Sequence, residues 1–465
     1  MSTQKIPYQR SLPKRSYQSV PKKPTKRTNT RLIWLLFSLT GVAMLSATAG
    51  ALLAVSLATT PLMQSKLSPE EAAVFGQGES ISSNPNFRLP QLTRPVSILV
   101  LGAKVLSTDV ENPPAYARNL GYHATLNSFE GLTDTMLLIR FDPDTKKLAV
   151  LSIPRDTRTY IEGYGVTKIN EANYYGGPAL SAKATSELLD GVGIDRYVRV
   201  NVQGIEKLID ALGGVTVYIP KDMKYQDDSQ HLYINLKAGK HHLNGNQALQ
   251  FLRFRYDENG DIGRIQRQQM LMRALMEQAL NPVTLARVPK ILSVIQSHLD
   301  TNLSVEELVA LVGFATQTNR SNVQMLMVPG DFSASGEYEA SYWIPDHDRI
   351  QSIMAQHFNL GASSALPTNP AYLRVAIQDS TRESAATDGV MNTLAEAGYS
   401  NVSVNNPWSE PLNVTRIVAQ QGDAESAEAL RQILGVGEVR IESTGALQSD
   451  VTIQIGKDWL RQNSR

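Results

Sequence analysis

The sequence contains no cysteine and only seven histidines among its 465 residues. The absence of cysteine excludes disulfides, thiol nucleophiles and thiolate metal sites. The His241–His242 pair has no acidic residue at metal-ligand spacing, so no histidine-based metal centre is indicated. A strong charge bias is lacking too: the net charge is +1, and no nucleic-acid partner is expected.

The first 60 residues consist of a basic stretch followed by a long stretch that has no charged residue. Residues 1–31 hold nine Lys or Arg and no Asp or Glu, which predicts a disordered basic arm in the cytoplasm. Residues 32–60 carry no charge and exceed the ~20 apolar residues that a bilayer span needs, so they predict a transmembrane helix. A cleaved signal peptide has a shorter apolar core. We therefore expect an uncleaved, single-pass anchor in the cell membrane, with the folded domains extracytoplasmic.

The rest of the chain divides by composition. Residues 61–95 are polar and contain glycine and proline, which predicts a stalk. Residues 96–360 form the main domain. Residues 361–370, GASSALPTNP, have linker composition, and residues 371–465 form a smaller α+β domain without a charged constellation.

The pattern in the main domain predicts an α/β (α+β) sandwich with a central mixed sheet covered by helices. VSILVLG at 96–102 has the continuous apolar character of a buried strand. MLLIRF at 136–141 and LAVLSI at 148–153 flank the turn DPDT and predict a hairpin. LTDT enters the first of these strands and PRDT leaves the second, so the two motifs are expected side by side.

Arginine is concentrated in QALQFLRFRYDENGDIGRIQRQQ, residues 247–269. On an extended segment, Arg253 and Arg255 leave the same face while Phe254 points into the body. Arg264, Arg267 and Gln268 fall in the opening turns of a predicted helix. Such an arrangement fits a polyanion such as a diphosphate. Surface salt bridges or RNA contacts are the alternatives for these arginines.

Other reaction classes lack their residues. No Ser-His-Asp arrangement, paired carboxylates or Walker-type loop accompanies the arginines. An arginine cluster is compatible with phosphoryl transfer, whose catalysis consists mostly of positioning and charge stabilisation.

The order of motifs resembles the LytR-CpsA-Psr family of the cell envelope. The matching pieces are VLG at 100–102, LTDTMLL, SIPRDT, KINEA, the Gly176–Gly177 pair, IDALGGV and LNGNQALQFLRFRYDENGDIGRIQRQQ. They follow the family's order from Val96 to about Phe358, and the tail from Tyr372 to Gly456 resembles the LytR carboxy-terminal domain. Seven ordered motifs are a far stronger signal than any one of them.

The resemblance implies a phosphotransferase that moves a glycopolymer from a polyprenyl-diphosphate carrier to peptidoglycan in cell wall assembly, with a pyrophosphatase side activity. The expected partners are that lipid-linked glycan, peptidoglycan and membrane lipid, and the lipid tail is expected in the apolar interior. Carried over position by position, the catalytic residues are Arg253, Arg255 and Asp134, and Asp134 is the Mg²⁺ ligand. The diphosphate-binding residues are Arg155, Lys168, Arg253, Arg255, Arg264, Arg267 and Gln268, supported by Asp261 and Lys104.

Two positions depart from the family pattern. Lys104 stands where the family usually has a second metal-binding Asp, and Leu132 stands where it usually has Arg. A fixed ammonium can neutralise a diphosphate oxygen as a metal does, but metal-independent binding and loss of activity are open as well. The alternative functions are therefore a non-catalytic polyprenyl-phosphate-binding or wall-tethering protein and an envelope-related transcriptional regulator.

Overall fold

The computed structural model describes residues 62–76, 80–83, 90–104, 129–228, 232–254, 260–361 and 370–463. The chain divides into two compact units, Met1–Ser56 and Leu57–Arg465, and every described residue belongs to the second. The predicted basic arm and the predicted transmembrane helix lie outside the described residues. Within the described part of the chain, no helix has the length and apolar character that a bilayer crossing requires.

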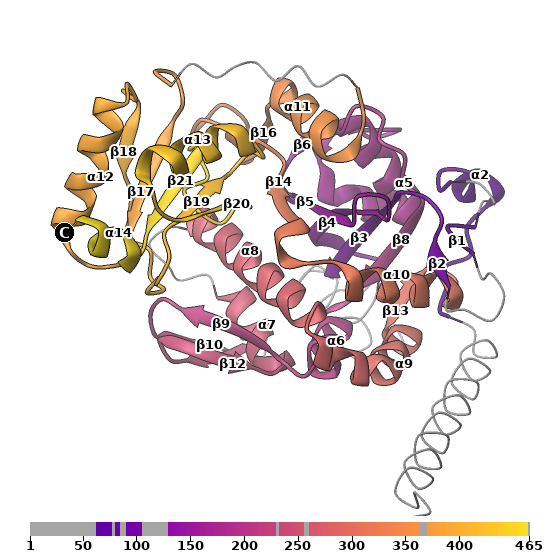
Figure 1. Ribbon diagram of the computed structural model, residues 1–465. Coiled ribbons are helices and arrows are strands. Elements are labelled where there is room, and N and C mark those ends of the chain that lie inside the picture. The colour runs from indigo at the N-terminus through magenta and orange to yellow at the C-terminus, as the bar shows by residue number, and fades with distance from the viewer. Residues whose placement is uncertain are drawn as a thin grey trace, which may run out of the picture. The chain divides into compact units, whose positions relative to one another are not determined.

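A six-stranded mixed sheet lies at the centre of the main domain (Figure 1). In spatial order its strands are β13 (Leu299–Thr301), β8 (Arg196–Val200), β3 (Val96–Lys104), β4 (Leu132–Asp142), β5 (Lys147–Ile153) and β14 (Val323–Met327). The three strands β3, β4 and β5 are antiparallel neighbours, whereas β8 pairs with β3 and β14 pairs with β5 in parallel. The predicted hairpin and central mixed sheet are confirmed.

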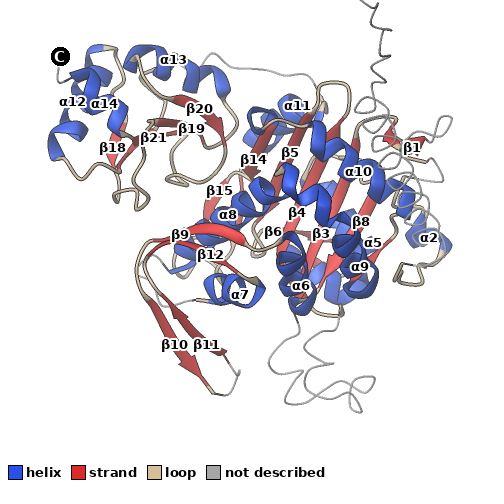
Figure 2. Cartoon of the chain, turned by 60° about the horizontal axis from the view of Figure 1, so that its bottom comes forward, coloured by secondary structure: helices blue, strands red, loops and turns tan. Residues whose placement is uncertain are grey.

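Helices cover both faces of this sheet (Figure 2). On one face lie α5 (Ala172–Leu188) and α11 (His347–Phe358), and on the other lie α8 (Gly260–Ala279) and α10 (Val305–Gln317). Successive residues of a strand point to opposite faces. Leu99 of β3 therefore packs on the α5 side, and its neighbour Val100 packs on the α8 side.

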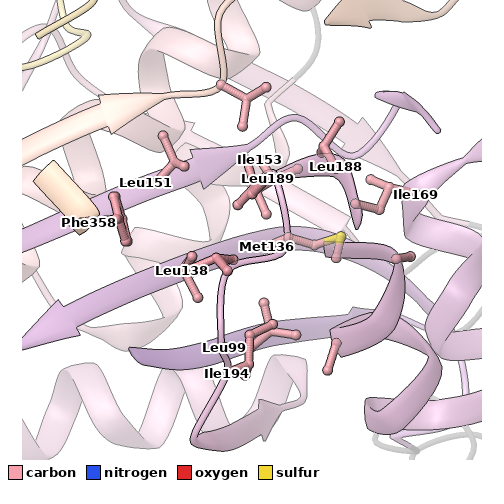
Figure 3. Close-up of a cluster of buried hydrophobic side chains, with 14 of the residues drawn as sticks. Leu99, Met136, Leu138, Leu151, Ile153, Ile169, Leu188, Leu189, Ile194 and Phe358 are labelled. Carbon is pink, nitrogen blue, oxygen red and sulfur yellow. The ribbon is translucent and has the colours of Figure 1, made fainter. Parts of the chain in front are cut away.

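The core on the α5 side is closely packed. Leu99 and Leu138 of the sheet are 0% exposed. Figure 3 shows them in one cluster with Leu151, Leu188 of α5 and Phe358 of α11. This burial explains why the central strands read as continuous apolar runs, since helices cover both of their faces.

The Gly176–Gly177 pair breaks α5. Gly177 has φ +61° and ψ −153°, a conformation that only glycine adopts without strain. Pro178 follows at the start of the second helical segment, where its missing N–H leaves no helical hydrogen bond unmade.

A second, smaller core lies beside α8. Its elements are α6 (Val202–Leu212), β9 (Val215–Ile219), β10 (Met223–Asp227), β11 (Leu232–Leu236), β12 (Gly239–Leu243) and α7 (Gly245–Arg253). β9 pairs with β12 and β10 pairs with β11, both antiparallel.

The prediction that QALQFLRFR is extended is wrong, because its first seven residues end the helix α7. Asn244 accepts a hydrogen bond from the Gln247 N–H, and the Gln247 side chain accepts one from the Asn244 N–H. This reciprocal cap favours a helix start. Phe254 ends α7 with extended backbone and is 3% exposed, so its expected orientation into the body is confirmed.

The stalk predicted for residues 61–95 is wrong for its described residues, because they pack against the main domain. Phe75 and Ile81 are 2% and 0% exposed. The Phe75 ring lies 5.0 Å from the ring of Tyr197, centroid to centroid. A few apolar side chains among polar residues are enough to fold this segment onto the domain. Its elements are α2 (Pro69–Ala72), β1 (Ser82–Ser83) and β2 (Gln91–Leu92).

Short elements complete the main domain. They are β6 (Arg158–Ile161), β7 (Gly165–Lys168), η1 (Ile169–Glu171), η2 (Pro282–Arg287), α9 (Val288–His298), η3 (Arg320–Asn322), β15 (Gly330–Phe332) and β16 (Trp343–Pro345). The hairpin β6–β7 brings the chain from the end of β5 to Lys168.

The predicted second α+β domain has its own sheet and core. The strands, in spatial order, are β18 (Val402–Val404), β17 (Val375–Asp379), β21 (Val451–Ile455), β19 (Arg416–Ala419) and β20 (Glu438–Ile441). The helices are α12 (Ser384–Glu396), α13 (Ala424–Leu434) and α14 (Lys457–Asn463). Most of the predicted linker lies outside the described residues.

Candidate functional site

Asp134 lies on a β-bulge near the start of β4. Gly102 pairs with Thr135 and Ala103 pairs with Thr133, so Asp134 is the extra residue on its strand. A bulge turns a side chain out of the regular alternation and is common beside functional sites. The Asp134 side chain is 32% exposed, so it presents a carboxylate at this end of the sheet.

Arg155 and Asp156 directly follow β5, beside Asp134. Arg155 donates from Nη1 to Oδ1 of Asp134 at 2.6 Å and from Nε to Oδ2 of Asp156 at 3.2 Å. The antiparallel pairing of β4 with β5 brings these strand ends together. The predicted proximity of LTDT and PRDT is confirmed.

Asp156 is the centre of the group, although the sequence analysis gave it no role. Its Oδ1 accepts a hydrogen bond from Lys168 Nζ at 2.8 Å, and its Oδ2 lies 3.6 Å from Nη2 of Arg264. Three cations from three segments therefore meet on one carboxylate. The available signal was its position at the strand end directly after Arg155. We call Asp134, Arg155, Asp156, Lys168 and Arg264 the arginine cluster.

Gln268 lies one helical turn after Arg264 and borders two small pockets. The first is lined by Pro154, Arg155, Asp156, Arg264, Ile265, Gln268, Phe332 and Trp343. The second joins Asp134 and Gln268 to the apolar side chains of Leu137 and Met272. The polar cluster is thus continuous with the α8 side of the sheet.

Cations exceed carboxylates in the arginine cluster by three to two. Partial burial alone would lower the pKa of Arg155, but the carboxylates of Asp134 and Asp156 outweigh burial and raise that pKa. The side chains of the cluster are 13–32% exposed. An incoming oxyanion can therefore reach these cations and replace a carboxylate as their hydrogen-bond acceptor.

The structure describes the remaining expected site residues, Arg253, Arg255, Asp261 and Lys104, only in part. Arg253 is the last residue of α7 and is half-buried, and Arg255 lies outside the described residues. Asp261 falls in the first turn of α8, but the description does not extend to its side chain. The same holds for Lys104, whose backbone pairs with Leu132. The two departures from the family pattern thus face each other across β3 and β4.

Arg267 lies apart from the pockets that the arginine cluster lines. Its Nη2 donates to the carbonyl oxygen of Phe254 at 2.5 Å, and its guanidinium lies 5.7 Å from the centre of the Phe254 ring. Burial lowers its pKa to about 10, so it stays protonated at neutral pH. These contacts join the start of α8 to the end of α7.

The carboxylates fit Mg²⁺ only in combination with a substrate. Among the described residues, no group of three or more His, Asp or Glu could hold a metal unaided. Asp134 offers a partly exposed carboxylate beside a cation cluster. Mg²⁺ keeps several waters and needs one or two carboxylates when phosphates complete its coordination. This donor set is therefore sufficient only when a phosphate is present.

A second arginine–aspartate group is buried inside the domain. Arg199 donates from Nε to Oδ2 of Asp300 at 2.6 Å and from Nη2 to Oγ of Ser65 at 2.5 Å. Ser65 in turn donates its backbone N–H to Oδ1 of Asp300 at 2.6 Å. The Arg199 and Asp300 side chains are 4% and 3% exposed. We call Ser65, Arg199 and Asp300 the Arg199 clasp.

Two family models match the chain. Residues 62–359 match the LytR_cpsA_psr family, and residues 372–459 match the LytR cell envelope-related transcriptional attenuator family. The first match begins inside the segment that we expected to be a stalk, in agreement with its packing against the domain.

Curated relatives and a solved structure are similar to parts of the chain. Regulatory protein MsrR of Staphylococcus aureus is 37% identical over 173 residues, covering 37% of this chain and 51% of the relative, so the chain spans about half the length of that protein. The polyisoprenyl-teichoic acid–peptidoglycan teichoic acid transferase TagU of Bacillus cereus is 32% identical over 260 residues, covering 55% of this chain and 75% of the relative. The crystal structure of Bacillus subtilis TagV is 27% identical and covers 58% of this chain and 99% of that one, with a TM-score of 0.47.

Proposed function

The chain belongs to the LytR_cpsA_psr family, and from this premise we propose that it is a transferase that moves a glycopolymer from a polyprenyl-diphosphate carrier to peptidoglycan in cell wall assembly. The relative TagU is named for such a reaction with teichoic acid. The proposal includes the anchor at residues 32–60, which would hold the domain outside the cytoplasmic membrane, where lipid-linked substrates are accessible.

The observation that carries the proposal is the arginine cluster. Arg155, Lys168 and Arg264 converge on Asp156, and their side chains are partly exposed. A diphosphate supplies several acceptor oxygens, and these would replace contacts to Asp156 with charge-assisted hydrogen bonds to phosphate. Arg264 also lies in an early turn of α8, where the helix dipole favours an anion.

The proposed reaction needs charge stabilisation more than covalent chemistry by the protein. A hydroxyl of the acceptor attacks the phosphorus that bears the glycopolymer, and a new oxygen–phosphorus bond forms as the hydroxyl loses its proton. The bond between that phosphorus and the bridging oxygen breaks, and polyprenyl phosphate leaves. The arginine cluster would hold the diphosphate in line and stabilise the charge on the leaving phosphate. Attack by water instead would produce the proposed pyrophosphatase side activity.

The α8 face of the sheet fits the tail of the lipid. Val100 and Ile139 lie on the central strands β3 and β4, yet both are only half-buried, whereas Leu99 and Leu138 on the opposite face are 0% exposed. Their half-buried apolar neighbours on this face include Phe141, Met272 and Met276. Leu137 and Val150 on this face are buried, so the helices leave only part of it open, and an apolar chain would gain contacts in that part.

Magnesium is a further part of the proposal. Asp134 would hold Mg²⁺ together with oxygens of the diphosphate. When bound, the metal would withdraw charge from the transferring phosphate. Arg155 would keep its present role and orient the Asp134 carboxylate through the 2.6 Å hydrogen bond.

The alternative is a protein that binds polyprenyl phosphates without catalysis. The specific feature in its favour is Lys104, which ends β3 at the position where the family resemblance implies a carboxylate. A transfer assay separates the two. The purified full-length chain in detergent is given a synthetic lipid-linked diphosphate sugar and peptidoglycan fragments, with and without Mg²⁺. We expect transfer that depends on the cluster, whereas lipid binding without product would establish the alternative.

Two arginines that the family resemblance singles out are tested in the same assay. Arg253→Ala and Arg255→Ala should each lose most of the transfer, because a charge-assisted hydrogen bond contributes roughly 1.5–3 kcal/mol. Arg255→Lys should restore only part of the rate, since lysine lacks the bidentate fork. Wild-type rates in both alanine variants would remove these residues from the site.

The lipid face is tested by mass spectrometry of an organic extract of the purified protein. We expect a copurifying polyprenyl species in the wild type and its loss in Val100→Phe, because the larger ring would fill the space on the α8 side of the sheet. A control, Val404→Phe, places the same change at an exposed position of the second domain. Absence of any polyprenyl species from the folded wild type would contradict the lipid part of the proposal.

A further inference from the structure

A groove of about 950 Å³ lies between α8 and the second domain. Gly263, Gln266 and Met270 of α8 contribute to one wall, and residues of β17, β18 and the loop after β18 form the other. Its volume is at the upper end of the range for ligand-binding pockets, about 300–1,000 Å³. None of the expected site residues except Arg267 contributes to its lining.

The lining is rich in neutral hydrogen-bonding groups. Six of its side chains are amides, and they are Gln266, Gln378, Asn401, Asn405, Asn406 and Gln448. An amide both donates and accepts hydrogen bonds, as a sugar hydroxyl does. The charged side chains in the lining are Lys221, Arg267, Asp331 and Arg374. Arg374 is bound by Asp450 at 2.8 Å, and Arg267 donates to the carbonyl oxygen of Phe254. The amides outnumber these charged groups, so the groove offers many partners for the hydroxyls of a sugar polymer.

Trp408 adds an aromatic side chain to this lining. Its indole Nε1 is buried and has no hydrogen-bond partner among the described residues. A buried donor without a partner is unfavourable and is usually satisfied by water or a ligand. The accessible part of the Trp408 ring supplies an apolar surface for a sugar ring beside the amide groups.

Several contacts join the second domain to the main domain. The backbone N–H of Ser443 donates to the carbonyl of Met325 at 2.8 Å, and its hydroxyl accepts from the N–H of Met327 at 3.0 Å. Arg273 of α8 forms an ion pair with Glu442 at 3.5 Å. The second domain is thus joined to β14 and to α8, the helix that carries Arg264.

The groove and the arginine cluster share the early turns of α8. Arg264 and Gln268 line the pocket of the cluster, whereas Gly263 and Gln266 line the groove. β15 makes a second connection, because Asp331 lines the groove and the adjacent Phe332 lines that pocket. The groove and the pocket of the cluster are therefore lined by neighbouring residues of α8 and β15.

We propose that this groove binds the acceptor glycan strand, an inference that rests on the proposed function. The first sugar of the donor is bonded to its phosphate and must lie at the cluster itself. A separate groove across the first turns of α8 fits the second substrate, a strand of pyranose rings that approaches from outside. The second domain thereby becomes part of the acceptor site.

Kinetics of the full-length chain with lipid-linked donor and peptidoglycan-derived tetrasaccharide test the assignment. Trp408→Ala and Asn405→Ala should each raise the KM for the tetrasaccharide about tenfold, the effect of losing one ring or amide contact. The kcat and the KM for the donor should stay within about twofold. Asn392→Ala, at an exposed asparagine of the same domain outside the groove, should match the wild type. A raised KM for the donor alone would overturn the assignment to the acceptor, and unchanged constants in both groove variants would overturn the site.

Calorimetric titration of the tetrasaccharide separates this proposal from the proposed function. If the wild type transfers nothing, the function proposal fails, and the titration alone decides the groove. Binding by the wild type and by Asn392→Ala, with weaker binding by Asn405→Ala, supports it. Because Asn405 is exposed, its variant is expected to fold. The absence of measurable binding by the folded wild type overturns the proposal.

Discussion

The arginine cluster and the Arg199 clasp each contain an arginine–aspartate ion pair of the same length. The two groups differ in their exposure and in their balance of cations and carboxylates. In each, an arginine donates to an aspartate at 2.6 Å. The Arg199 and Asp300 side chains of the clasp are 3–4% exposed and match one cation with one carboxylate. The cluster is partly exposed and gathers three cations around two carboxylates. The clasp is therefore internally satisfied, and the cluster can accept a further anion.

The positions of the two groups explain this difference. The clasp joins residue 65 to the sheet strands β8 and β13, and Thr301 donates its N–H to the carbonyl of Met63 at 3.0 Å. It holds together segments more than a hundred residues apart in the sequence. The cluster forms at strand ends and at a helix start, where side chains reach solvent. One group stabilises the fold, and the other presents charge.

The largest expected effect comes from breaking the clasp. Asp300→Ala leaves the Arg199 guanidinium buried without its counter-charge, which costs about 3–5 kcal/mol of unfolding free energy. Urea denaturation measures the loss. Asp134→Ala is the matched control, because it removes the same residue type from an equally short but partly exposed pair, and it should cost less than about 1 kcal/mol. Equal losses in the two variants would show that the groups do not differ as described.

A smaller effect, on activity alone, is expected from Arg264→Ala. It should lower the transfer rate roughly 10- to 150-fold, which corresponds to the 1.5–3 kcal/mol of a charge-assisted hydrogen bond. The unfolding free energy should change by less than about 1 kcal/mol. Arg320→Ala removes a more exposed arginine that pairs with Glu277 and should leave the rate unchanged. If Arg264→Ala instead unfolds the protein and the folded fraction retains full activity, the cluster is structural like the clasp.

The sequence could predict the parts of the cluster that depend on strand order. Two adjacent apolar runs with a short turn make a hairpin, and a hairpin brings LTDT and PRDT together. That reasoning placed Asp134 beside Arg155. It could not identify the central role of Asp156, because that role depends on Lys168 and Arg264 arriving from a hairpin and a helix distant in sequence.

Other errors came from local patterns that tertiary contacts or caps override. The run around Arg253 alternates as a strand does, but the capping box at Asn244 begins a helix there. The segment before Val96 has the composition of a linker, yet Phe75 and Ile81 find places in the domain. The bulge at Asp134 has no signal in the residues themselves, since it is a mismatch of register between two strands.

The smallest expected effect concerns Lys104 and sharpens the charge difference between the two groups. Lys104 ends β3, and its backbone pairs with Leu132, two residues before Asp134. If it lies at the family's second carboxylate position, Lys104→Asp gives the cluster a third carboxylate and brings two of them near the proposed Mg²⁺ position. Calorimetry in the presence of a diphosphate lipid should then show severalfold tighter Mg²⁺ binding than in the wild type, because Mg²⁺ sites commonly use one or two carboxylates with substrate phosphates.

Asp134→Asn should weaken the same binding, which controls for metal held by the lipid alone. The clasp offers a second control, because Asp300 is buried and should not bind Mg²⁺. Mg²⁺ should therefore not change the free energy of unfolding by binding to Asp300. Identical Mg²⁺ affinity in Lys104→Asp and the wild type would mean that Lys104 lies away from the metal position and that VLGAK is wrongly matched to the family motif.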